Sequence, residues 1–145
     1  MPFEGGPYIK AAVFVGQVIE GKDNVLSLIR VIDRLVSAAS GLEPPQEMPT
    51  VTFSMSAVIM IVAGKARGRH QVKLVREAPN TERKDIWIGG ILLEGENKGH
   101  NLNLALNESF SLEGIYWYDV FIDDQLMTRM PFQVVYQPST AGVAR

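Results

Sequence analysis

The sequence predicts an all-β protein, a two-layer antiparallel β-sandwich of about eight strands with little helix. Glycine and proline recur at short intervals, and the runs between them are rich in Val, Ile, Phe, Tyr and Trp, which is the pattern of strands separated by turns. No window of about eleven residues carries the 3.6-residue periodicity of an amphipathic helix. Jelly-roll and immunoglobulin-like connectivities both fit this pattern.

The composition is that of one folded domain. The 145 residues are 46% hydrophobic and carry a net charge of −2, so the chain can bury one core, and its bulk charge argues neither for nor against a nucleic-acid partner. It contains no cysteine, which excludes disulfides and thiolate metal sites. No signal peptide is apparent, and the longest apolar run, residues 57–63, is far shorter than a membrane helix. We therefore expect a cytoplasmic protein without cofactor or membrane contact.

The first half of the chain is expected to contain three strands. Residues 8–20 and 24–36 form a hairpin, because the Gly-Lys-Asp-Asn sequence at residues 21–24 tolerates the positive φ of a tight turn. Residues 37–49 are expected to be a loop, because prolines interrupt them. Residues 50–62 alternate at first and are then apolar on both faces, so the loop, another strand layer or a second copy should cover both faces.

The second half is expected to contain five more strands, separated by short turns or loops. Paired glycines inside one of them, Gly89-Gly90, indicate a bulge or a close approach of backbones. The expected strands are residues 69–77, 86–94, 100–107, 115–122 and 125–136. The domain should then span residues 8–136, with flexible segments at residues 1–7 and 137–145.

Two segments carry a resemblance to a known family. The opening hairpin runs from Phe14-Val15-Gly16 to Ile32-Asp33-Arg34-Leu35, and the closing hairpin runs from Gly114-Ile115-Tyr116 to Pro131-Phe132-Gln133-Val134. Together they resemble a family of small bacterial β-sandwich proteins of unknown function, over most of residues 8–136. Asp124 stands where the family usually has glycine, and Glu113 where proline often precedes the glycine. The resemblance implies a β-sandwich and implies no activity.

Basic side chains concentrate between residues 65 and 84. This stretch has a charge of +5, which leaves −7 for the rest of the chain. Such a cluster could bind an acidic protein partner, including the acidic part of a second copy, or neutralise phosphates of nucleic acid. Nucleic acid is the less expected partner because no aromatic residue is interleaved, and the charges could simply solvate a hairpin and block edge pairing. The candidate partner-binding residues are Lys65, Arg67, Arg69, Lys73 and Arg76.

Three aromatic residues form a second candidate site. Trp117 and Phe121 alternate with buried positions of one strand, and Trp87 lies in a strand expected to be a neighbour. Exposed aromatics suit a carbohydrate platform or a protein interface, and the outward Asn101, Asn103 and Asn107 could add hydrogen bonds. Ordinary core packing is the alternative.

No catalytic arrangement is recognisable in the sequence. His70 and His100 have no second ligand at a metal-binding spacing, and no Gly-x-Ser-x-Gly motif is present. We therefore expect no enzyme, no metal site and no catalytic residues. The leading hypothesis is a non-enzymatic, self-associating interaction module that forms a homo-oligomer. A carbohydrate- or small-ligand-binding sandwich, and a nucleic-acid accessory protein using residues 65–84, are the alternatives.

Overall fold

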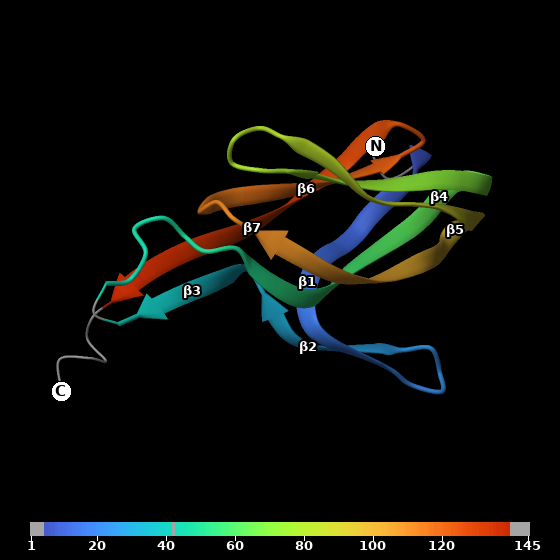
Figure 1. The fold of residues 1–145 in the computed structure, drawn as a ribbon. Coiled ribbons are helices and arrows are strands. Elements are labelled where there is room, and N and C mark those ends of the chain that lie inside the picture. The colour runs from blue at the N-terminus through green and yellow to red at the C-terminus, as the bar shows by residue number, and fades with distance from the viewer. Residues whose placement is uncertain (1–4, 42, 140–145) are drawn as a thin grey trace.

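Every element of the structure, a computed structural model that describes residues 5–41 and 43–139, is a β-strand (Figure 1). The prediction of an all-β protein is therefore confirmed. The strands are β1 (Tyr8–Glu20), β2 (Leu26–Ile32), β3 (Arg34–Ser40), β4 (Val51–Glu77), β5 (Arg83–Phe110), β6 (Gly114–Ile122) and β7 (Gln125–Ser139).

The strands are hydrogen-bonded in the order β2-β1-β4-β6-β7-β3, and β5 pairs with β4 off this path. All pairs are antiparallel except β3 with β7, which run parallel from Arg34↔Gln133 to Ser40↔Ser139. The prediction of purely antiparallel pairing was therefore wrong. Turn residues in a sequence predict antiparallel hairpins between consecutive strands. They cannot predict this parallel pair, because its two strands lie far apart in the sequence.

β4 and β5 form one long, bent hairpin, visible in Figure 1 as two strands that curve together. Residues 51–62 of β4 pair with residues 99–110 of β5, and residues 56–62 also pair with β1. Residues 67–77 pair with residues 83–94 of β5, and residues 72–77 also pair with β6. The register shifts at the bend, where Gly64, Gly68 and Gly95 have positive φ, a conformation that glycine adopts without strain. Four of the predicted strands are thus two bent ones.

Two further boundaries differ from the sequence prediction. The predicted strand at residues 24–36 is divided at Asp33 into β2 and β3, and β3 takes the first residues of the predicted loop. The described part of the chain therefore has seven strands where about eight were expected. Exposed and half-buried residues alternate along residues 34–40, as in a strand. The predicted loop began too early, at residue 37, because that prediction depended on the prolines that follow.

The core is formed by inward-facing residues of β1, β4, β5, β6 and β7. Phe14 of β1 meets Tyr118 of β6 and Phe132 of β7 edge to face, with ring centroids 4.9 and 5.6 Å apart. Phe110 at the end of β5 stacks on Phe132 at 5.5 Å and meets Tyr116 edge to face at 4.8 Å. These aromatic contacts join strands that are not neighbours in the sheet and are the arrangements that aromatic pairs prefer.

The predicted flexible ends lie largely outside the described residues, and their flexibility stays a prediction. β7 reaches Ser139, which is paired with Ser40. In the described part of the chain, no helix is long and apolar enough to cross a membrane.

Candidate functional site: two unlike outer faces

The strands β2, β1, the first part of β4 and the second part of β5 present a face with no charge at eighteen positions, which we call the neutral face. Lys10 lines a hollow at its edge together with Met60 and Asn101, and two residues of the face, Val15 and Val58, are fully buried. The residues of the neutral face alternate with core residues along each strand, and the strand register places them in continuous rows, such as Val31–Val15–Ser56–Ala105. Eighteen positions of a chain that is 21% charged would carry about four charges at random, and here they carry none. They are Ala11, Val13, Val15, Gln17, Ile19, Ser27, Ile29, Val31, Thr52, Ser54, Ser56, Val58, Met60, Asn101, Asn103, Ala105, Asn107 and Ser109.

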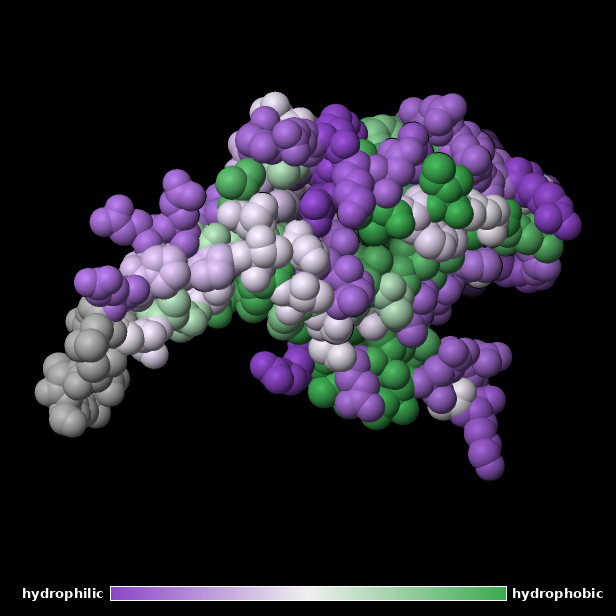
Figure 2. Space-filling model, in the orientation of Figure 1, coloured by the Kyte–Doolittle hydropathy of each residue, from purple (hydrophilic) through white to green (hydrophobic). Residues whose placement is uncertain are grey.

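The neutral face is apolar at one end and polar at the other. On β2, Val31 is 65% exposed and Ile29 is also exposed, and Figure 2 shows hydrophobic side chains gathered over the β1–β2 hairpin. Toward β5, small polar side chains hydrogen-bond to one another: Thr52 Oγ1 lies 3.1 Å from Ser109 Oγ, and Ser54 donates to Asn107 Oδ1 at 3.0 Å. These bonds link β4 to β5 at the polar end, where Ser54, Ser56, Ala105 and Asn107 contribute to a hollow.

The second part of β4, the first part of β5, β6 and β7 present the opposite kind of surface, which we call the charged face. Its centre is Asp119, which is only 3% exposed. The Asp119 carboxylate accepts from Arg129 Nε at 2.7 Å and from Arg83 Nη1 at 3.2 Å. Glu77 accepts from the same two arginines. A carboxylate can be buried here because both of its oxygens are paired with cations.

Arg129 binds in two ways on this face. Its guanidinium carbon lies 4.8 Å from the centre of the Trp117 ring, a cation–π arrangement. Its hydrogen bonds to Asp119 and then to Glu77 raise the pKa of Arg129 above its ordinary value. Trp117, a candidate ligand-binding aromatic, is thus already occupied by a side chain of its own protein.

The five candidate partner-binding cations do not form one stripe. Lys65 and Arg67 lie at the bend of β4, and Arg67 donates to the Glu94 carbonyl at 3.2 Å. Arg69 is exposed beyond the bend, and Lys73 lies on the charged face, 3.6 Å from Asp85. Arg76 points to the core side instead. The five cations are therefore not gathered at one site, and they do not form a row of unpaired charges. Their role in binding stays a prediction.

Arg76 belongs to a buried polar group that the sequence did not reveal. Its Nη1 donates to Glu108 Oε1 at 3.2 Å, and Tyr118 Oη donates to the same oxygen at 2.8 Å. The guanidinium lies 5.4 Å from the Tyr116 ring centre and 5.7 Å from that of Phe110. Burial, and next the charge of Glu108, raise the pKa of Tyr118 far above its ordinary value, so the phenol stays protonated and donates. This group ties β4, β5 and β6 together.

The three candidate aromatics are divided between the two sides of the sheet. Trp87 packs against the core cluster and is paired with Leu74, which is fully buried. Trp117 and Phe121 lie on the charged face, opposite Glu77 and Lys73. Trp87, Trp117 and Phe121 therefore do not form one ligand-binding surface, although Phe121 contributes to a hollow described below.

His70, one of the two histidines considered for catalysis or metal binding, is held by structural contacts. His70 Nδ1 lies 2.5 Å from Asp123 Oδ2, and the Gln71 N–H donates to Asp123 Oδ1 at 2.9 Å. The hydrogen bonds from Gln71 and then His70 lower the pKa of Asp123 below its ordinary value. No group of three or more His, Asp or Glu residues suited to a metal ion occurs in residues 5–41 and 43–139.

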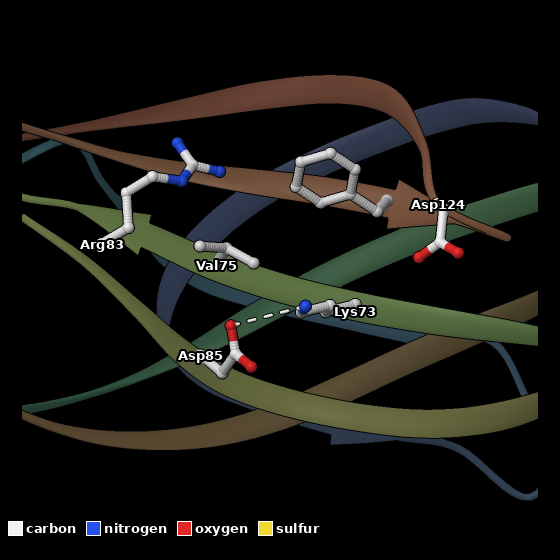
Figure 3. A pocket seen from close by; sticks show the side chains of 6 residues that line it. Lys73, Val75, Arg83, Asp85 and Asp124 are labelled. Carbon is white, nitrogen blue, oxygen red and sulfur yellow. Dashed lines mark ion pairs between the residues drawn. The ribbon is translucent and has the colours of Figure 1, made fainter.

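A shallow hollow of about 200 Å³ opens on the charged face, lined by Lys73, Val75, Arg83, Asp85, Phe121 and Asp124. Figure 3 shows Arg83 toward one end of the hollow and Asp124 toward the other, with the Lys73–Asp85 pair below. Phe121 also lines the hollow. The hollow thus combines an apolar surface with charges of both signs.

No family model and no curated protein matches the chain. Among solved structures, it is similar to a β-glucosidase from Listeria innocua in complex with glucose, with 10% identity and a TM-score of 0.45, over 86% of this chain and 16% of that one. It is also similar to an immunoglobulin-like protein from Pseudomonas aeruginosa, with 14% identity and a TM-score of 0.41, over 90% and 98%. Because these TM-scores lie below 0.5, neither fold nor function is inferred from them.

Proposed function

We propose that the protein is a non-enzymatic interaction module that self-associates through its neutral face. The observation that supports this most directly is the absence of charge from eighteen register-paired positions. Charges are depleted from the centres of protein interfaces because covering them requires their desolvation. A face without charge can meet a copy of itself around a twofold axis without electrostatic repulsion.

The neutral face is close to the size that a second copy would cover. Eighteen outward residues, each taking about 4.8 Å across the sheet and about 6.6 Å along a strand, present roughly 570 Å² of sheet area. A standard interface buries about 800 Å² on each partner. The exposed apolar residues Ile19, Ile29 and Val31 at one end would supply the hydrophobic part of such an interface.

We also propose that the chain is a two-layer β-sandwich in the cytoplasm. The layers would be β2-β1 with the first part of β4 and the second part of β5, and β6-β7-β3 with the other two parts. The aromatic contacts of Phe14 with Tyr118 and Phe132 support this, because they join strands of the two layers. The lack of cysteine supports a reducing compartment.

Sedimentation analysis tests the proposed self-association. The wild type is expected to be dimeric at about 100 μM. Asn103→Asp combined with Asn107→Asp adds four carboxylates to a symmetric dimer without changing side-chain size, and should weaken dimerisation at least about tenfold. Both positions are exposed, so the fold should survive.

The matched control is Gln133→Glu combined with Gln137→Glu, which adds the same charge at exposed positions of β7, away from the neutral face. This control should dimerise like the wild type. A monomeric wild type at the stated concentration would contradict the proposal, as would a neutral-face variant that dimerises as tightly as the control.

A further inference from the structure

The hollow on the charged face has an apolar surface and one unpaired carboxylate. Val75 is nearly buried, and Phe121, which is half-buried, also lines the hollow. Asp124 lies toward the end of the hollow opposite Arg83, at the turn between β6 and β7. The turn is held in place because Asp123 Oδ1 accepts from the Gln71 N–H, and its own N–H donates to the Gln71 carbonyl, both at 2.9 Å.

The cations around the hollow are already neutralised. Lys73 pairs with Asp85 at 3.6 Å, and Arg83 pairs with both Glu77 and Asp119 at 3.1 and 3.2 Å. Asp124 has no hydrogen bond or ion pair with any other residue that the structure describes. The charge that remains for a ligand is therefore negative, and it shares the hollow with the aromatic side chain of Phe121.

We propose that this hollow binds an ammonium or guanidinium group carried on an apolar stem, the chemistry of a lysine or arginine side chain. The stem would lie on Phe121 and Val75, and the cation would meet the carboxylate of Asp124 and the face of the Phe121 ring. Aromatic rings attract cations through their quadrupole, and long basic side chains lay their methylene groups on apolar surface. An anion is disfavoured, since Lys73 and Arg83 would have to give up their present partners. This site is independent of self-association, because the hollow lies on the charged face.

Nuclear magnetic resonance titration of the full chain tests the proposal with n-butylammonium, the peptide Ala-Lys-Ala, and butyrate as the anionic counterpart. Both cations should shift the amide signals of Phe121, Asp124 and Lys73 at millimolar concentration, and butyrate should leave them unchanged. Tighter binding of the peptide identifies a basic side chain of another chain as the source, whereas equal binding identifies a free amine.

Asp124→Asn should weaken binding of both cations about fivefold, and Phe121→Leu should weaken it by a similar factor, since exposed ion pairs and cation–π contacts are each modest. The matched control is Glu82→Gln, which removes an exposed carboxylate in the turn between β4 and β5 and should bind like the wild type. The proposal is overturned if neither cation shifts these signals, if butyrate binds as well, or if Asp124→Asn binds like the control.

Discussion

The neutral face and the charged face share two strands, β4 and β5, yet the first has no charged residues at its eighteen positions and the second has many. Before the bend of β4, the outward residues are Thr52, Ser54 and Ser56 and their neighbours, none of them charged; beyond it they include Arg69, Lys73 and Glu77. On the charged face most charges have partners, down to the nearly buried Asp119. The difference teaches that the charged face keeps charges that the chain itself largely pairs, whereas the absence of charge from the neutral face is what the proposed self-association requires, because covering a charge there would desolvate it.

The largest loss of stability is expected when the buried ion pair of Arg76 and Glu108 is broken. Glu108→Ala would leave the Arg76 guanidinium, whose side chain is 14% exposed, without its carboxylate, and should lower the free energy of unfolding by about 3–5 kcal/mol. Urea denaturation monitored by circular dichroism measures this. Glu94→Ala, which removes an exposed carboxylate, is the control and should change stability by less than about 0.5 kcal/mol. Equal effects of the two variants would show that the buried pair has no structural role.

A smaller loss is expected at the centre of the charged face. Asp119→Ala removes the carboxylate shared by Arg83 and Arg129 and should cost about 1–3 kcal/mol of unfolding free energy. The value should lie at the lower end because the two arginines are about 40% exposed and are partly screened. Asp85→Ala breaks only the exposed pair with Lys73 and should cost at most about 1 kcal/mol in the same urea titration. A loss for Asp85→Ala as large as that for Asp119→Ala would contradict this ranking.

The salt dependence of dimerisation should show which of the two faces forms the interface. Dimerisation through the neutral face should change by less than about threefold between 0.05 and 1 M NaCl, because no ion pair would be formed or broken there. Sedimentation equilibrium over this range provides the measurement. A dissociation constant that rises more than about tenfold would place the interface on charged groups instead.

The smallest effect is expected from Asp123. Its pKa is lowered in the folded protein, so its contribution to stability is complete above the ordinary value of about 3.9 and is lost as pH falls through the folded value. Asp123→Asn should therefore flatten the loss of stability below about pH 4, while leaving the shape of the profile at neutral pH unchanged. Thermal unfolding between about pH 2.5 and 7 measures this, and identical acid profiles would contradict it.

Much of the local structure follows from residue patterns. Alternation identified the strand-forming segments, and the Gly-Lys-Asp-Asn and Asp-Asp sequences identified the turns after β1 and β6. Glu108 could also have been found, because it stands in phase with the inward Leu102, Leu104 and Leu106. A charged residue at an inward position indicates a buried partner, and only the identity of that partner, Arg76, needed the structure.

The pairing at Asp119 shows why other features could not be predicted. A regular hairpin around the turn at Asp123 and Asp124 would place Asp119 opposite Thr128. The register shifts between Val120 and Phe121, so that Asp119 is opposite Arg129. A bulge of one residue depends on how both strands fit the rest of the sheet, and it converts an outward aspartate into a buried one with two cationic partners.

By itself the sequence determined that this protein is built of strands and where most of them lie, because alternation and turn chemistry act over a few residues. The tertiary structure alone decided that four predicted strands are two bent ones, that β3 runs parallel to β7, that Trp87 and Trp117 face opposite sides, and that the uncharged positions of four strands form one continuous face. Each of these depends on register and pairing between distant segments, whose energies are set by contacts that no local pattern contains.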